Sequence, residues 1–336
     1  MREVSGGGTG ARVAVQKIII DCDPGIDDAL ALVFAHGHPD LELRGITTVA
    51  GNVGLDLTTA NALRVRDFVG MRDVPVIPGC PGPLQRAALN ARAVHGDSGL
   101  GAASLPAAWS GPADGHAVDY LARATAAEPG QITLIAIGPL TNVALALRRH
   151  PELVSQVRNF VIMGGSAGRG NVTPAAEFNI AADPEAAAIV FGAGWTVTMV
   201  GLDVTLQARA TAAVRDRMRG LGRLADELVL PSLAGYRNVS RGPGSESGGS
   251  GPAVHDVCAV ASVAAPELLT CLPARVEVET AGRWTSGMTV TDFNAADDAC
   301  NARVAVSIDA GAFWDLVLDA YTRVAAKLGA AGVTPR

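Results

Sequence analysis

The chain has 336 residues, of which 49% are hydrophobic and 18% are charged, and its formal net charge is -6. This composition excludes a disordered chain and allows a sizeable core. The negative charge and the lack of basic runs argue against nucleic acid or an anionic membrane as a partner. We expect no transmembrane helix and no secretory signal, because no long apolar run occurs along the chain or near its start.

The cysteines are scattered, without the paired spacing of a zinc site or of a disulfide framework. An odd number of dispersed thiols in an acidic chain is typical of reduced cysteines in a cytoplasm. We therefore expect a cytoplasmic protein in which these residues are small buried apolar side chains: Cys22, Cys80, Cys258, Cys271 and Cys300.

Short apolar runs and longer helical stretches alternate after a glycine-rich start. Residues 1–16 are expected to form a loose tail. Strands that end in turns are predicted in five segments: 17–25, 42–52, 131–142, 159–171 and 195–205. The first three of these segments are followed by helical patterns: 26–37, 55–70 and 143–151. Alternation of this kind predicts a parallel sheet with crossover helices.

The remaining segments complete one large domain, 17–330. Residues 275–293 and 302–321 predict a hairpin or edge strands and a final helix. The dense glycine and serine of 241–252 indicate a flexible loop inside the domain. Because the strands are continuous apolar runs, they should be buried on both faces. We predict a Rossmann-like α/β domain with a mostly parallel sheet, a mixed edge, and its site at the carboxyl ends of the strands.

Four carboxylates crowd into eight residues where the first predicted strand ends: Asp21, Asp23, Asp27 and Asp28. Like charges this close repel one another and resist ionisation. Either a bound cation or the N-terminus of the next helix would hold them ionised. An all-oxygen cluster suits a hard cation such as Ca²⁺ or Mg²⁺. Helix capping by solvated acids is the structural alternative.

Polar residues also follow the other predicted strands, and they should converge on the same edge of the sheet. They are Asn52, the segment 137–142, Asn171, Glu177 and Asn179. Any one asparagine is equally well explained by a turn, whereas the convergent set favours a polar pocket.

His255 and Asp256 open a later apolar helical run. The aspartate is either an N-cap or a further metal ligand. The histidine beside it is a candidate proton donor.

Seven ordered motifs between Lys17 and Arg323 resemble the nucleoside hydrolase family, most of all its inosine–uridine-preferring members. They are DCDPGIDDALAL, ITTVAGN, HGDSGLG, GPLTN, MGGSAGRGN with AEFN and DPEAA, MVGLDVT, and AVHD. The resemblance implies hydrolysis of the N-glycosidic bond of ribonucleosides to ribose and free base. It also implies one Ca²⁺ per subunit, held by Asp23, Asp28, Asp256 and the backbone carbonyl of Ile137.

The resemblance further assigns catalytic and ribose-binding roles. Asp23 would deprotonate the attacking water and His255 would protonate the leaving base, with inversion at the anomeric carbon. The ribose hydroxyls would be bound by one set of residues: Asp27 and Asn52 at the 2′ position, Asn179 at the 3′ position, and Asn171 and Glu177 at the 5′ position.

Base recognition is the part that the resemblance leaves open. His95 and Tyr236 would lie on the base side, and Tyr236 is the only aromatic residue between Leu233 and His255. Relatives are commonly homotetramers or homodimers, so a homo-oligomer is expected. Two other functions are weighed: an aspartate-nucleophile phosphatase and a non-catalytic nucleoside- or ribose-binding protein.

Overall fold

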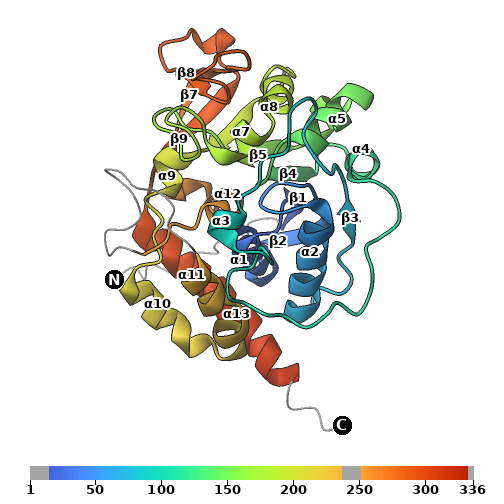
Figure 1. Ribbon diagram of the computed structural model, residues 1–336, viewed down its shortest axis with the longest axis vertical. Coiled ribbons are helices and arrows are strands. Elements are labelled where there is room, and N and C mark those ends of the chain that lie inside the picture. The colour runs from blue at the N-terminus through green and yellow to red at the C-terminus, as the bar shows by residue number, and fades with distance from the viewer. Residues whose placement is uncertain (1–14, 237–250, 332–336) are drawn as a thin grey trace, which may run out of the picture.

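A computed structural model describes residues 15–236 and 251–331, which form one nine-stranded sheet with helices on both faces (Figure 1). The strands are β1 (Gln16–Cys22), β2 (Leu41–Thr48), β3 (Val76–Pro78), β4 (Ile132–Ala136), β5 (Asn159–Met163), β6 (Val197–Val200), β7 (Leu269–Val278), β8 (Thr289–Asp292) and β9 (Ala302–Ile308).

The helices are α1 (Ile26–Gly37), α2 (Leu55–Val69), α3 (Arg92–His95), α4 (Ala117–Ala127), α5 (Thr141–Arg149), α6 (Leu153–Gln156), α7 (Phe178–Ala182), α8 (Pro184–Phe191), α9 (Leu202–Thr205), α10 (Ala212–Met218), α11 (Leu230–Gly235), α12 (Asp256–Ala264) and α13 (Ala310–Ala331). Short turns of 3₁₀ or π helix are η1 (Arg219–Leu221), η2 (Ala225–Val229), η3 (Pro266–Leu268) and η4 (Asp297–Ala299).

The strands are arranged in the order β3-β2-β1-β4-β5-β6-β9-β7-β8. Every neighbouring pair from β3 to β9 is parallel, whereas β7 is antiparallel to both β9 and β8. This confirms the predicted single α/β domain with a mostly parallel sheet and a mixed edge.

The hairpin and the final helix predicted for 275–293 and 302–321 are confirmed by the antiparallel pair β7–β8 and by α13, whereas an edge position is wrong for β9. β9 pairs with β6 on one side and with β7 on the other, so the strand within 302–321 is an interior strand and not an edge strand. Its side chains Val304 and Ala305 are buried accordingly. The two edges are β8 and the three-residue β3, which is too short to carry a hydrophobic pattern that sequence reasoning would detect.

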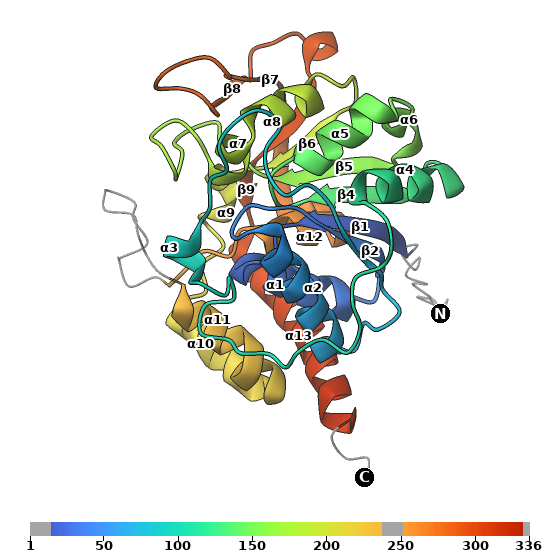
Figure 2. The same cartoon turned by 45° about the vertical axis from the view of Figure 1, so that its right-hand side comes forward.

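Alternate side chains of the strands enter two separate cores. In β1, Ile18 and Ile20 belong to the core beneath α1, α12 and α13, whereas Ile19 belongs to the core beneath α4, α5 and α8. Figure 2 shows these two groups of helices on opposite sides of the sheet. Burial on both faces explains why the strands are continuous apolar runs in the sequence.

The topology determines where a site can form. From β1 the chain moves outward to β2 and β3, and it then returns to β4 on the other side of β1. In open α/β sheets, the crevice at such a switch point, beyond the carboxyl ends of the strands, is where ligands bind. Asp23 comes directly after β1 and Ile137 directly after β4, so both lie at this point.

The predicted tail and loop lie largely outside the described residues. Gln16, the last residue of the predicted tail 1–16, is the first residue of β1. Of the predicted flexible loop 241–252, only Gly251 and Pro252 are described, and the Pro252 carbonyl accepts a hydrogen bond of 2.8 Å from Ala210 N. No helix within the described ranges is both long and apolar enough to cross a membrane.

We predict opposite effects on stability for two Gly→Ala substitutions in packed and open helix positions. A Cβ at Gly37, in α1, would lie 2.2 Å from the Ala320 carbonyl oxygen of α13. Gly37→Ala should therefore lower the free energy of unfolding by about 1–3 kcal/mol through overpacking. Gly329→Ala, in the last turn of α13 with open space around it, should raise this free energy by up to about 0.5–1 kcal/mol. Urea unfolding of both variants measures the two changes, and equal stability would contradict the predicted close packing of α1 on α13.

Candidate active site

Asp28 holds the turn between β1 and α1 together. It is the third residue of α1, and its carboxylate accepts backbone N–H groups from Asp23 (3.1 Å) and Gly25 (2.9 Å). Asn52, in the turn after β2, donates its side-chain amide to Asp28 Oδ2 and to the Asp23 carbonyl, both at 3.1 Å. Helix capping, the alternative raised from the sequence, thus accounts for part of the role of Asp28.

The Asp23 carboxylate lies in a cradle made by two glycines. A Cβ at Gly51 would lie 2.1 Å from its Oδ2, and a Cβ at Gly138 would lie 2.6 Å from its Oδ1. Oδ2 accepts the backbone N–H of Asn52 at 2.7 Å, whereas buried Oδ1 has no hydrogen-bond partner within the described residues. One oxygen of this carboxylate is therefore left for a ligand.

Asp21, the first carboxylate of the cluster, has a structural role. Its Oδ1 accepts hydrogen bonds from the Thr47 hydroxyl (2.5 Å) and the Asn142 amide (2.8 Å). Asn142 also donates to the Thr48 carbonyl and accepts from Cys80 N. These bonds join the ends of β1, β2, β3 and β4, so Asn142 stabilises the floor of the site.

Asn179 joins the end of β4 to the end of β5. Its side-chain amide donates to the carbonyls of Ile137 (3.0 Å) and Met163 (2.9 Å). Both donors of the amide are thereby used, and its oxygen is the atom left to accept a hydrogen bond from a ligand.

Glu177 and Asn171 shape the loop that follows β5. Glu177 is the N-cap of α7, and its carboxylate accepts backbone N–H groups from Gly165, Asn179 and Ile180. Burial raises the pKa of Glu177 to about 6, although these hydrogen bonds act in the opposite direction. Asn171 is exposed and accepts a hydrogen bond from Phe178 N at 3.0 Å, so of the predicted ribose residues it is the least enclosed.

His255 and Asp256 enter the site at the start of α12. The His255 backbone N–H donates to Asp27 Oδ2 at 3.1 Å, and its ring Nδ1 lies 2.7 Å from the Thr205 hydroxyl. Asp256 is the first residue of α12, whereas the N-cap position belongs to His255. Burial lowers the pKa of His255 to about 4, and the charge of Arg209 acts in the same direction.

His95 and Tyr236 lie together on another side of the site. His95 Nδ1 accepts the backbone N–H of Ile26 at 3.1 Å, which places its ring over the start of α1. The two rings meet edge to face, with their centroids 5.8 Å apart. Burial lowers the pKa of His95 to about 4, with a smaller contribution from the nearby His255.

The loop that carries His95 is fastened at its far end. Arg86 makes a bidentate ion pair with Glu185 at the start of α8, and it also donates to the Ser286 hydroxyl and the Thr280 carbonyl of the β7–β8 connection. Leu84 N donates to the N-cap of α8, Asp183. This clamp links three separate segments at the edge of the site.

The carboxylates influence one another strongly. Burial raises the pKa of Asp23, Asp28 and Asp256. The charge of Asp28 raises the pKa of Asp23 further, and Asp28, Asp27 and Asp23 together do the same for Asp256. Repulsion of this kind disfavours three ionised groups unless a positive charge joins them.

The donor atoms fit a hard cation by their chemistry. They are carboxylate and carbonyl oxygens, and one of them, Asp23 Oδ1, is buried and has no hydrogen-bond partner among the residues that the structure describes. Within 15–236 and 251–331, however, no three His, Cys, Asp or Glu side chains already stand in an arrangement that would hold a metal ion. The oxygens of the described residues therefore lie near one another but do not form a complete coordination shell.

Sequence reasoning missed three residues that build the site. Asp203 and Thr205 come from α9, where Asp203 accepts from Ala167 N (2.8 Å) in the loop after β5. Asn61, in α2, donates to the carbonyls of Pro24 (3.0 Å) and Ser98 (2.8 Å) and so joins two loops of the site. The motif MVGLDVT contained a signal for the first two residues, whereas Asn61 falls in an ordinary helical pattern.

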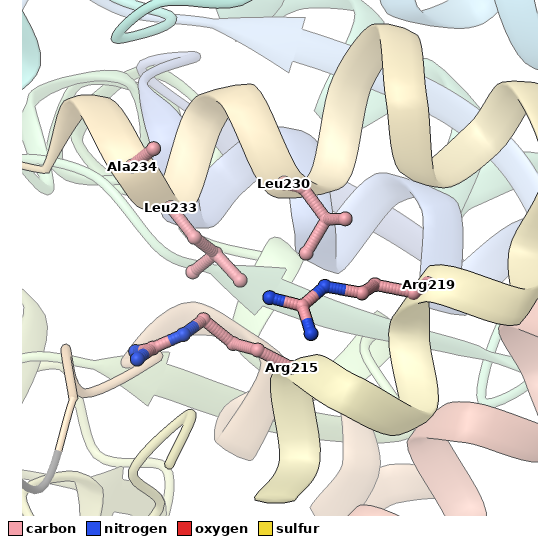
Figure 3. Close-up of a pocket in the computed structure, with 5 residues that line it drawn as sticks. All are labelled: Arg215, Arg219, Leu230, Leu233 and Ala234. Carbon is pink, nitrogen blue, oxygen red and sulfur yellow. The ribbon is translucent and has the colours of Figure 1, made fainter. Parts of the chain in front are cut away.

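A separate pocket of about 430 Å³ lies between α11 and the segment formed by α10 and η1 (Figure 3). Figure 3 shows Arg215 and Arg219 on one side of it and Leu230, Leu233 and Ala234 on the other. None of these residues has a carboxylate or amide side chain. The side chains that line this pocket therefore offer no oxygen atoms like those beside the ends of β1 and β4.

Fold and site together define an α/β enzyme with an acidic centre at the switch point of its sheet. A family model described as "Inosine-uridine preferring nucleoside hydrolase" matches residues 18–315. An inosine-uridine preferring nucleoside hydrolase of Leishmania major is 46% identical over 312 residues, which are 92% of this chain and 98% of that protein. The chain belongs to this family, whose members are hydrolases that act on N-glycosyl bonds.

Other relatives differ in the bases that their names state. A pyrimidine-specific ribonucleoside hydrolase of Salmonella schwarzengrund is 43% identical over 90% of this chain and 97% of its own. The structure of a purine-preferring ribonucleoside hydrolase from Gardnerella vaginalis is 32% identical, with a TM-score of 0.84 and coverage of 92% and 99%. These matches favour a ribonucleoside hydrolase over the phosphatase and the non-catalytic binding protein considered above.

We predict that the glycine cradle of Asp23 is needed for turnover. Gly51→Ala should push the Asp23 carboxylate out of place, and a displacement of about 1 Å can lower the rate roughly 100-fold. Gly54→Ala is the matched control, because a Cβ there meets nothing within 4 Å. Ribose release and thermal unfolding are measured for both variants. Full activity of Gly51→Ala would show that the cradle has no role in turnover.

Proposed function

We propose that this ribonucleoside hydrolase depends on one Ca²⁺ and cleaves its substrate by attack of water with inversion at the anomeric carbon. The observation that carries the proposal is the group of mutually repelling, buried carboxylates at the carboxyl ends of β1 and β4. Carboxylates in such a group would bind a cation and would stabilise positive charge that develops on the substrate.

Asp23, Asp28, Asp256 and the Ile137 carbonyl are the proposed calcium ligands. A cation bound by them would compensate their mutual repulsion, and it would supply the acidity that makes a nearby water easy to deprotonate. Within the described residues Asp23 Oδ1 has no hydrogen-bond partner, which supports its second proposed role as the base that takes a proton from that water. The hydroxyl oxygen then bonds to the anomeric carbon.

The ribose would lie against the turns that follow the strands. Asp27 and Asn52 are proposed to bind the 2′-hydroxyl, Asn179 the 3′-hydroxyl through its amide oxygen, and Asn171 and Glu177 the 5′-hydroxyl. Cleavage of a glycosidic bond passes through an oxocarbenium-like cation. Carboxylate and amide oxygens stabilise that cation more than the neutral substrate, which is the condition for a faster reaction.

The leaving base would lie beside His255, His95 and Tyr236. When the glycosidic C–N bond breaks, its electron pair stays with the base, and His255 is proposed to give a proton to a base nitrogen. Because its pKa is lowered to about 4, the ring is a strong acid, and only its small protonated fraction carries out this step. The relatives bear names that range from purine to pyrimidine preference, and we propose that this chain accepts both inosine and uridine. Its homo-oligomeric state and cytoplasmic location remain predictions from the sequence.

A ribose-release assay tests this proposal directly. The substrates are inosine, adenosine, guanosine, uridine and cytidine, each with and without a chelator, and with Ca²⁺ restored afterwards. We expect ribose from inosine and uridine, a loss of activity with the chelator, and recovery with Ca²⁺. Activity that is insensitive to the chelator would refute the calcium requirement, and release from only one base class would refute the broad base range.

Asp23→Asn should separate the chemistry from the fold. We expect ribose release to fall by about 10²–10⁴-fold, because a general base and a calcium ligand are lost together. Calcium affinity, measured by titration calorimetry, should fall as well. The control is Asp56→Asn, which removes an exposed carboxylate from the first turn of α2 and should keep both properties. Equal activity of the two variants would remove Asp23 from the catalytic role.

A further inference from the structure

The short helix α9 supports two separate parts of the site. It follows β6, and together with its N-cap Gly201 it forms the motif GLDVT, to which the proposed function gives no role. Asp203 accepts hydrogen bonds from Ala167 N (2.8 Å) and from the Ser166 hydroxyl (3.2 Å), which hold the loop after β5. Thr205, two residues further on, contacts the ring of His255.

We propose that Thr205 is a positioning residue, whose hydroxyl holds Nδ1 of His255 so that Nε2 is the nitrogen that serves the leaving base. This inference rests on the proposed function, in which His255 protonates the base. It adds a residue that touches neither substrate nor cation and acts only through the orientation of the ring.

The contact is short and fully enclosed. Thr205 Oγ1 lies 2.7 Å from His255 Nδ1, Thr205 is 0% exposed and His255 is 8% exposed. A hydrogen bond between buried groups is costly to break, because neither group is solvated when it is lost. The ring is therefore held in one orientation while substrate enters and product leaves.

The Thr205 hydroxyl is available for this bond alone. Within residues 15–236 and 251–331 it has no second hydrogen-bond partner. Its backbone is fixed in the first turn after β6, where Thr205 N donates to the Gly201 carbonyl at 3.1 Å. A threonine side chain has two main rotamers in a helix, so the hydroxyl has few alternative positions.

The backbone of His255 is anchored as well. Its N–H donates to Asp27 Oδ2 at 3.1 Å, and Thr205 holds the ring at the opposite end of the residue. These two contacts, one on the main chain and one on the ring, restrict the direction in which Nε2 points. In histidine generally, the hydrogen bond made by one ring nitrogen determines which state the other nitrogen adopts, and thus which nitrogen can exchange a proton with a ligand.

The hydroxyl oxygen of Thr205 can accept a hydrogen bond from Nδ1–H in both stages of the proton transfer. In the protonated ring, Nδ1–H donates to Thr205 Oγ1. As the C–N bond breaks and its electron pair stays with the base, the Nε2 proton moves to a base nitrogen and the ring becomes neutral. Nδ1–H still donates to Thr205 afterwards, so the orientation persists through the step.

The test compares two leaving groups in one enzyme. Hypoxanthine leaves inosine with the help of a proton, whereas p-nitrophenolate leaves p-nitrophenyl β-D-ribofuranoside without one. Thr205→Val removes the hydroxyl at nearly constant volume, and Thr205→Ser keeps it. We expect Thr205→Val to lower kcat for inosine by about 10- to 100-fold, part of the usual contribution of a general acid, with little change in KM.

The same variant should keep kcat for the nitrophenyl riboside within about three-fold, and Thr205→Ser should restore most of the activity on inosine. His255→Ala should show the same selectivity, and adding Thr205→Val to it should have no further effect, since coupled residues are not additive. Equal losses on both substrates, or no loss on inosine, would overturn the proposal. Failure of the wild-type enzyme on both substrates would instead defeat the proposed function.

A spectroscopic measurement gives a readout other than activity. In ¹⁵N-histidine-labelled protein, the ring signals of His255 are those that disappear in His255→Ala. Thr205→Val should shift these signals at constant pH and leave those of His36 and His150, which lie elsewhere in the chain, in place. Unshifted His255 signals in a folded Thr205→Val variant would refute the hydrogen bond on which the inference depends.

Discussion

Repulsion between buried carboxylates is the constraint on which this structure depends. Asp23, Asp28 and Asp256 meet in a region without solvent, where each makes ionisation of another more costly. The protein offsets part of this cost with main-chain N–H groups and the Asn52 amide, which bind Asp28 and Asp23. The remaining repulsion favours a positive charge at this place, and the proposed calcium ion and the proposed oxocarbenium-like transition state would both supply one.

The sheet makes it possible to hold such a group in place. Reversal of strand order between β1 and β4 brings Asp23 and Ile137 side by side, and Asn142 joins four strand ends beneath them. Asp23 and Ile137 therefore lie in turns that directly follow parallel strands of the sheet. Their positions depend on the sheet itself, which is buried on both faces.

Much of this arrangement could be predicted from the sequence because it is local. Asp23, Asp27 and Asp28 lie within six residues, and the strand that precedes them is a plain apolar run. The interior position of β9 could not be predicted, since its neighbours β6 and β7 are defined by pairings distant in the chain. Thr205 was missed for a similar reason: its partner His255 is 50 residues away, and no periodic pattern records such a contact.

The two halves of the site rest on different parts of the fold. Residues proposed for calcium and ribose come mostly from strand-end turns, whereas His95 and Tyr236 come from α3 and the end of α11, outside the sheet. Substitutions in these outer helices leave the pairing of β1 with β4 untouched. If His95 and Tyr236 contact the base as proposed, base preference can diverge during evolution while the reaction is preserved. The purine-preferring and pyrimidine-specific relatives, which share so much of this chain, are consistent with such a history.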